Sequence, residues 1–88
     1  MRFANIEECK NYFKNLKKGY LINLKRGEDV YIFAEIISAD EQGIKFNIYD
    51  FNYEINELIN LKIEGSFKYE ELVEMEVIGL WKKHLVTM

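Results

Sequence analysis

The chain has 88 residues, of which 49% are hydrophobic and 31% charged, with a formal net charge of −3 and no proline. This length suits one small domain spanning residues 1–88, and an aromatic content of 15% excludes an intrinsically disordered chain. One cysteine excludes an internal disulfide, and together with one histidine it leaves no basis for a Cys/His metal site.

The composition also predicts an origin and a location. Lysine outnumbers arginine ten to two, and residues with A/T-rich codons are abundant, which indicates a low-GC bacterium or one of its phages or plasmids. The longest apolar stretches are too short for a membrane span or for the core of a secretory signal. We therefore expect a cytoplasmic protein with no membrane partner, in which Cys9 is a reduced core residue.

Residues 5–18 are predicted to form an amphipathic helix. Asn5 is a favourable N-cap, and Glu8 three residues later completes a capping-box pattern. Gly19 follows as the expected helix terminator. At about 100° per residue, five apolar side chains fall on one arc of this helix: Ile6, Cys9, Tyr12, Phe13 and Leu16.

The rest of the chain is rich in β-branched and aromatic residues, which favours strands. Turns are predicted at 40–43, where Gly43 would supply a positive φ, and at Gly65-Ser66. The apolar parity shifts near Tyr49, which predicts a bulge or a bend. Residues 56–64 also fit a helical turn, and that alternative stays open. The strands that we expect span about residues 20–25, 29–39, 43–55, 58–64 and 72–81.

These elements predict an α+β domain, with an N-terminal amphipathic helix followed by a strongly bent antiparallel β-sheet or a small barrel of four to five strands. The pattern from Leu24 to Ile48 resembles the opening half of the Sm-like proteins. Its motifs are Leu24-Lys25-x-Gly27-x-x-Val30 and Ile36-x-x-x-Asp40-x-x-Gly43-Ile44-x-Phe46-x-Ile48, and Phe67-x-Tyr69-x-x-Leu72-Val73-x-Met75-x-Val77 is similar to the closing strands of such barrels.

The Sm-like resemblance implies an N-terminal helix and a five-stranded bent barrel, and SH3-like barrels are similar to the same pattern. Sm-like proteins bind uridine-rich RNA with an Asn in one turn and an Arg-Gly or Lys-His pair in another. The corresponding turns here are Asp40-Glu41-Gln42-Gly43-Ile44 and Tyr69-Glu70-Glu71-Leu72, without those residues. The resemblance therefore implies the fold and weakens the inference of RNA binding.

No residue pattern predicts an enzyme. His84 is the only imidazole and lies in a basic tail, and Cys9 lies on the apolar arc of the helix. Asp50, Asn52 and Glu54 alternate as at the start of a calcium loop, but the glycine and the terminal glutamate of such a loop are missing. We expect no catalytic residue, no metal and no cofactor. For Trp81 we favour a core position over an exposed partner anchor.

The charge is asymmetric, because residues 1–26 carry +5 and residues 27–81 carry −10. The favoured hypothesis is an acidic strand face that binds a basic protein partner stoichiometrically, as an inhibitor encoded by a phage or mobile element would. Its residues are Glu70, Glu71, Glu74 and Glu76. The alternative is an oligomeric Sm-like RNA-binding protein whose basic residues contact phosphates, namely Lys10, Lys14, Lys17, Lys18, Lys25 and Arg26.

Overall fold

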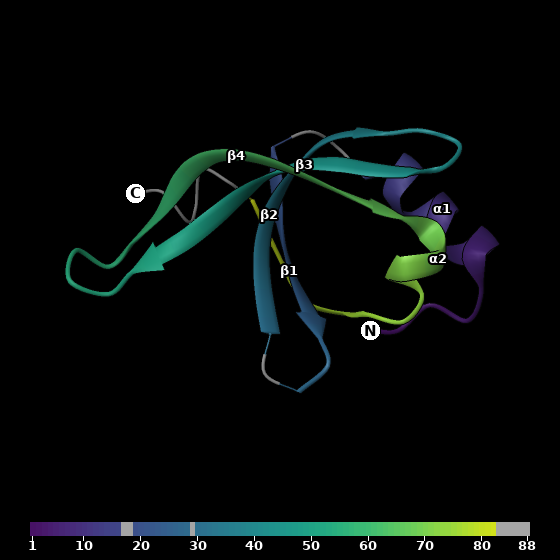
Figure 1. Ribbon diagram of the computed structural model, residues 1–88, viewed down its shortest axis with the longest axis horizontal. Coiled ribbons are helices and arrows are strands. Elements are labelled where there is room, and N and C mark those ends of the chain that lie inside the picture. Colours follow the sequence, from purple (N-terminus) through teal and green to yellow (C-terminus); the bar gives the residue numbers. More distant parts are fainter. Residues whose placement is uncertain (17–18, 29, 83–88) are drawn as a thin grey trace.

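The computed structural model describes residues 1–16, 19–28 and 30–82 (Figure 1). An N-terminal helix precedes one antiparallel sheet of five strands in the order β4-β3-β2-β1-β5, an α+β arrangement that is not closed into a barrel. β4 and β5 are therefore the two edge strands. The elements are α1 (Ile6–Lys14), β1 (Tyr20–Arg26), β2 (Val30–Ala39), β3 (Gly43–Asn52), β4 (Glu57–Lys68), α2 (Tyr69–Leu72) and β5 (Glu76–Lys82).

The predicted N-cap of α1 is confirmed, but the capping box is not completed, because Glu8 accepts from Ala4 rather than from the N–H of Asn5. The side-chain oxygen of Asn5 accepts a hydrogen bond of 2.9 Å from the backbone N–H of Glu8, and the Glu8 carboxylate accepts one of 3.4 Å from Ala4. The helix is shorter than predicted, because it ends at Lys14 and Asn15 is its C-cap. Lys17 and Lys18 lie outside the described residues.

The turn predicted at Gly65-Ser66 is wrong, because β4 runs through both residues to Lys68. Gly65 pairs with Phe46 of β3, and a Cβ on Gly65 would lie 2.6 Å from the Phe46 ring. Gly43 likewise does not adopt a positive φ, and a Cβ there would overlap the carbonyl oxygen of Phe67. Both glycines permit close approach of neighbouring strands rather than a turn conformation.

The last predicted strand is also wrong at its beginning. Residues 69–72 form the short helix α2, and β5 begins at Glu76 rather than at residue 72. The fragment from Tyr69 to Leu72, which resembled a closing strand, is therefore helical. β3 ends at Asn52 rather than at residue 55, and residues 53–56 form the turn into β4, with Asn56 at φ 56°.

Each of three strand pairs contains one register shift. The irregularity predicted near Tyr49 lies between Asn47 and Tyr49, but the extra residues are on the partner strand β4. Asn47 pairs with Glu64 and Tyr49 with Asn60, so that Ile48 faces the three residues 61–63. Lys62 adopts φ 57° in this bulge, and its backbone N–H donates a 2.8 Å hydrogen bond to Asn60 Oδ1.

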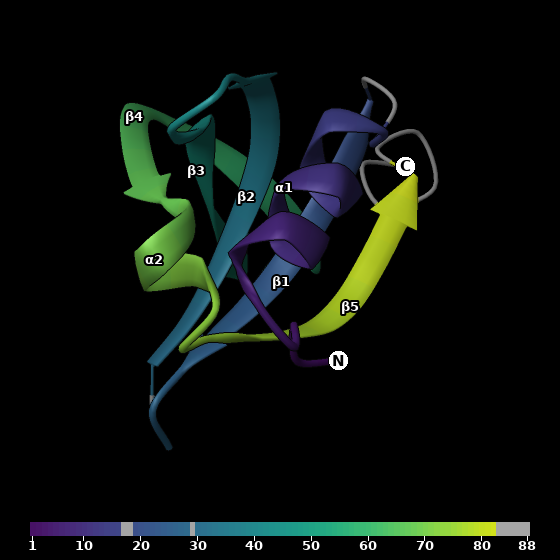
Figure 2. The ribbon, with the colours of Figure 1, turned by 90° about the vertical axis from the view of Figure 1, so that its right-hand side faces the viewer.

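The two faces of the sheet carry different amounts of buried apolar surface. The helix-side core lies between the sheet and the two helices, with α1 in front of β1 and β2 in Figure 2. Alternate residues of each strand point to the opposite face. There a second cluster consists of Leu21, Tyr49 and Leu58, with Phe33 and Phe51 packed against it. Buried members of the helix-side core include Cys9, Phe13, Ile22, Leu24, Phe46, Tyr69 and Leu72.

Candidate binding surfaces

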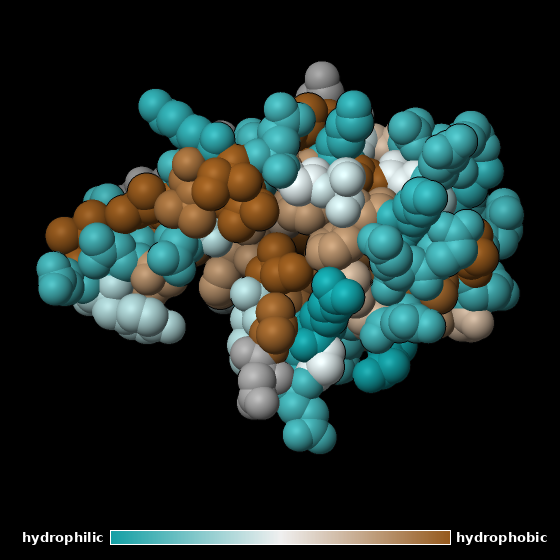
Figure 3. All heavy atoms as spheres, in the orientation of Figure 1, coloured by the Kyte–Doolittle hydropathy of each residue, from teal (hydrophilic) through white to brown (hydrophobic). Residues whose placement is uncertain are grey.

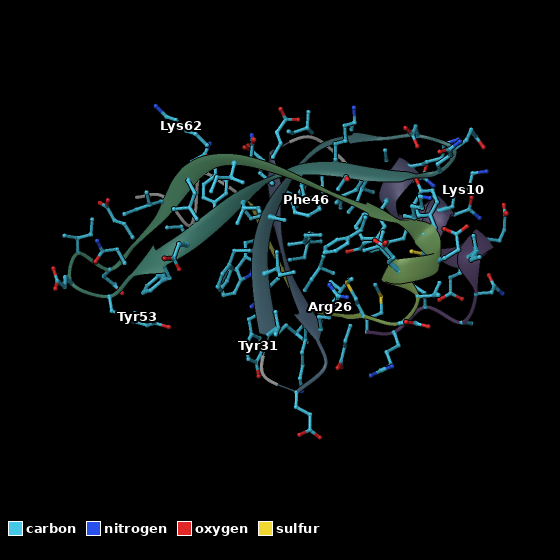
Figure 4. The ribbon with its side chains drawn as sticks, viewed as in Figure 1. Lys10, Arg26, Tyr31, Phe46, Tyr53 and Lys62 are labelled. Atoms are coloured by element: carbon cyan, nitrogen blue, oxygen red, sulfur yellow. The ribbon has the colours of Figure 1, made fainter. Side chains whose placement is uncertain are left out.

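The predicted basic stripe is divided between two places in the structure. Lys10 and Lys14 lie on α1, whereas Lys25 and Arg26 lie at the end of β1, next to the turn into β2. Figure 4 shows Arg26 near that turn and Lys10 near the helices, at separate places in the molecule. The remaining two lysines of the stripe, Lys17 and Lys18, lie outside the described residues.

The basic residues of α1 are paired with a carboxylate. Glu41, in the turn between β2 and β3, forms ion pairs with both Lys10 and Lys14. Hydrogen bonds from these two ammonium groups lower the pKa of Glu41 to about 2, and the hydrogen bond to Glu41 raises the pKa of Lys10. One carboxylate between two lysines reduces the positive potential that this face offers to a phosphate. Glu41 is about 30 residues away from the two lysines in the sequence, and no sequence pattern predicted that they would pair.

The turn that holds Glu41 is itself well fixed. Asp40 Oδ1 accepts hydrogen bonds of 2.7 Å from Gln42 N–H and 2.9 Å from Gly43 N–H, and these bonds lower the pKa of Asp40. The buried hydroxyl of Tyr69 donates a 2.6 Å hydrogen bond to the Asp40 carbonyl oxygen. α2 is thereby attached to the β2–β3 turn, which also carries the partner of both α1 lysines.

Three of the four predicted acidic site residues gather at α2. Glu70, Glu71 and Glu74 are exposed, and among the described residues Glu70 and Glu74 form no ion pair. Glu71 accepts a 3.3 Å hydrogen bond from Lys68 N–H. Glu76 is half-buried at the start of β5, 3.7 Å from the Met1 amino group. The prediction of an acidic strand face is wrong, because the group that we call the acidic cluster (Glu70, Glu71, Glu74) lies on a helical turn and the residues after it.

The two edge strands carry exposed apolar side chains that the sequence analysis did not single out. These are Ile59, Leu61 and Ile63 on β4 and Ile78 and Leu80 on β5, each between 38% and 52% exposed. Among the described residues no strand pairs with the outer edge of β4. The beginning of the outer edge of β5 is covered by the N-terminal residues: Arg2 pairs with Glu76, the Met1 amino group donates a 2.7 Å hydrogen bond to the Val77 carbonyl oxygen, and Val77 N–H donates one of 2.9 Å to the Met1 carbonyl oxygen. Figure 3 shows hydrophobic atoms gathered where β4 crosses the molecule. We call these two groups the apolar edges.

Trp81 is 47% exposed, which contradicts the favoured core position.

Cys9 is fully buried and free. Its burial, and to a smaller extent the negative charge of Glu8, raise the pKa of its thiol to about 11. Such a thiol is not an activated nucleophile at neutral pH. His84 lies outside the described residues. Within the described ranges no group of three or more His, Cys, Asp or Glu is arranged to hold a metal ion, and no helix is long and apolar enough to cross a membrane.

The chain was compared with known proteins in three ways. No protein-family model matches it, and neither a curated protein nor a solved structure gives a significant match.

Proposed function

We propose that this chain is a non-enzymatic binding module that captures another protein along the apolar edges of its sheet, with the acidic cluster selecting a basic partner. The observation that carries the proposal is the exposure of Ile59, Leu61 and Ile63 on one edge strand and of Ile78 and Leu80 on the other. Apolar side chains beside unpaired backbone groups are the features by which a sheet edge accepts a strand from another chain.

The geometry of the edges limits how a partner strand pairs. The bulge at residues 61–63 interrupts β4, and the register shift between Asn23 and Leu24 leaves Ile78 without a pairing partner on β1. A partner strand therefore pairs with short stretches of backbone on either side of the β4 bulge, and on β5 with the residues after Ile78, because Met1 and Arg2 already pair with Val77 and Glu76. The exposed side chains at the bulges supply apolar contact area. The hydrophobic free energy gained is roughly 25 cal/mol for each Å² of apolar surface removed from water.

The acidic cluster is placed to add electrostatic selectivity. α2 follows β4 directly and β5 begins four residues after α2, so Glu70, Glu71 and Glu74 lie at one end of both edge strands. A basic patch beside an apolar strand on the partner would match this arrangement, and opposite charges speed association more than they tighten binding. A cytoplasmic inhibitor from a phage or mobile element is one protein class that would use such a surface.

We also propose two finer features of the fold. A strongly bent, Sm-like or SH3-like sheet is supported by the consecutive pairing of β1 to β4, the return of β5 to β1, and the register shifts inside the ladders. An amphipathic α1 is supported by buried Cys9 and Phe13 beside exposed Glu7 and Glu8. Binding of RNA through α1 gains no support, because Glu41 pairs with Lys10 and Lys14.

The test introduces positive charges in place of apolar side chains on each edge. The double variants Leu61→Lys/Ile63→Lys and Ile78→Lys/Leu80→Lys should each weaken capture of a partner from a lysate of the source organism at least tenfold, since buried lysine at an interface carries a large desolvation cost. Val30→Lys is the matched control, because Val30 is 51% exposed at the start of β2, away from both edges. Light scattering of the purified chain would identify a second copy as the captured protein.

The acidic cluster has its own variant. Replacing Glu70, Glu71 and Glu74 by glutamine should slow association and flatten its dependence on salt, with a smaller effect on dissociation. The proposal fails when both edge variants capture the same proteins as the Val30→Lys control. It also fails when the chain stays monomeric and captures nothing.

A further inference from the structure

A small apolar cavity lies on the face of the sheet opposite α1. Its volume is about 150 Å³, and each of the five strands contributes one lining residue. Phe33 comes from β2, Phe51 from β3 and Leu58 from β4, all members of the second cluster or packed against it. Trp81 of β5 and Asn23 of β1 complete the lining. The cavity uses none of the apolar edge residues named above.

Aromatic rings form most of the wall of this cavity. Phe33 and Phe51 are half-buried, and the Trp81 indole is 47% exposed. Among the described residues none of these three rings packs against another, and Phe51 instead meets Tyr53 edge-on at a centroid distance of 4.7 Å. Rings from three strands therefore border one small space that they do not fill.

Hydrogen bonds contribute little to recognition in this cavity. Asn23 is the polar residue of the lining, but its side-chain oxygen is buried and closed to a ligand. The indole nitrogen of Trp81 lies over Gly79, where an added Cβ would come within 2.7 Å of Nε1. A ligand that depends on hydrogen bonds would lose those it makes to water without replacing them. The rings therefore decide which ligand is preferred.

A quaternary ammonium ion is the charged group that suits such a wall. The face of an aromatic ring is negative and attracts a cation, most strongly for tryptophan. A quaternary ammonium carries no N–H, so it needs no hydrogen-bond acceptor, whereas a lysine ammonium or an arginine guanidinium does. The methyl groups around its nitrogen also pack well against an apolar surface.

The charge of the chain favours a cation over an anion. The net charge is −3, and residues 27–81, which supply every lining residue except Asn23, carry −10. By strand alternation Glu35 shares a face with Phe33, and Lys25 shares it with Asn23, so the charges beside the lining on β2 and β1 offset each other. The field of the acidic chain as a whole then raises the local concentration of cations.

We propose that this cavity binds a small molecule with a quaternary ammonium group, such as choline. The trimethylammonium group would lie between Phe33, Phe51 and Trp81, and Leu58 would complete the apolar contact. A cavity of about 150 Å³ is large enough for a benzene ring, and a trimethylammonium group is of similar size. This inference goes beyond the proposed capture of a protein and does not depend on it.

The test compares choline with its neutral carbon analogue, dimethylbutanol, in which a tert-butyl group of the same shape replaces the trimethylammonium group. Trp81 is the single tryptophan, so its indole N–H gives one separate signal in a proton–nitrogen NMR spectrum. An apolar cavity without a preference for cations favours dimethylbutanol, because choline must give up the hydration of its charge. We expect the opposite order, with millimolar or tighter binding of choline and about tenfold weaker binding of dimethylbutanol.

Two variants assign the preference to the rings. Phe33→Leu keeps the wall apolar but removes one ring, so it should weaken choline binding about fivefold and change dimethylbutanol binding by less than about twofold. Phe67→Leu is the matched control, because Phe67 is also a partly buried phenylalanine but packs against the helix-side core. It should leave both affinities unchanged. A dispersed NMR spectrum checks that each variant is folded.

Three results would overturn the proposal. The first is that dimethylbutanol binds the wild-type chain as tightly as choline does, which would show an apolar cavity without selection for a cation. The second is that neither compound shifts the Trp81 signal. The third is that Phe33→Leu weakens choline binding no more than Phe67→Leu does, because the rings of the cavity would then not be the binding groups.

Discussion

The two faces of the sheet differ in the number of residues that they bury. Of the residues that the structure describes, twelve are buried in one continuous cluster on the face covered by α1 and α2, whereas three are buried on the opposite face, around a cavity. The first face has the close packing that gives most of the stability of a domain. The second face and the sheet edges leave apolar side chains partly in water, where they are available to a ligand or a partner. Stability and binding are thus expected to respond to different substitutions.

The largest effect should come from Phe13→Ala in the helix-side core. Phe13 is 1% exposed and its ring packs against Phe3 and Tyr12 at centroid distances of 5.7 and 5.0 Å. Truncation should lower the free energy of unfolding by about 3–5 kcal/mol, measured by urea denaturation. A loss below about 1 kcal/mol would mean that the helix contributes little to the core.

Gly43→Ala tests the close approach of β3 and β4 on the helix-covered side. A Cβ at Gly43 would overlap the backbone of Phe67, which cannot move without breaking the ladder, so we expect a loss of about 1–3 kcal/mol. Gly79→Ala is the comparison, since its Cβ meets the half-exposed Trp81 indole, which can swing into solvent. Chemical denaturation should show the smaller loss for Gly79→Ala, and equal losses would contradict the contrast between a fixed and a movable neighbour.

Leu58→Ala measures the second cluster directly. Leu58 is 8% exposed and already borders a cavity, so its removal enlarges an existing space rather than opening a new one. The free energy of unfolding should fall by about 2 kcal/mol, the lower end of the range for buried leucines and less than for Phe13→Ala. The contrast between the two faces would be broken if Leu58→Ala destabilised the chain as much as Phe13→Ala.

The smallest effect concerns the attachment of α1 through Glu41. Because the pKa of Glu41 is lowered from 4.5 to about 2 by Lys10 and Lys14, its contribution to stability is present above pH 4.5 and is lost as the pH falls toward 2. Glu41 lies at the surface, where water and salt screen its ion pairs. The change in stability should therefore be modest and should decrease with salt. Thermal unfolding of Glu41→Gln between pH 2 and 5, beside the wild type, measures it. Identical pH dependence in both chains would exclude a role for the ion pairs.

Local signals predicted the parts of the fold that depend on neighbouring residues. The Asn5–Glu8 pair marks the start of α1, and alternation in Ile44, Phe46 and Ile48 marks β3, because caps and pleats follow from short sequence spacings. The continuation of β4 through Gly65 was not predictable in this way. Gly65 is required there because a side chain would overlap the Phe46 ring of β3. A turn would also favour glycine, so the residue type alone does not distinguish a turn from a continuing strand.

The candidate sites depended on contacts that the sequence does not encode locally. Glu41 pairs with lysines about 30 residues away, and an alternating pattern such as Ile59, Leu61 and Ile63 indicates a face without indicating whether anything covers it. Glu70 and Glu71 could be recognised as an acidic group from the sequence, but their position on α2 rather than on a strand required the structure. The cavity joins five strands and had no sequence signal.

The bulge at Lys62 has a consequence for how the chain behaves at high concentration. Two more residues lie between Asn60 and Glu64 than between their partners Tyr49 and Asn47, and Figure 4 shows the Lys62 side chain pointing away from the sheet. Deleting Leu61 and Lys62 would restore an even ladder with unchanged side-chain alternation. It would also leave a straight edge with no charged residue between Glu57 and Glu64, closer to the type of template on which identical strands stack into fibrils. We therefore expect Lys62 and the left-handed backbone of this bulge to prevent copies of the chain from stacking through β4 into fibrils.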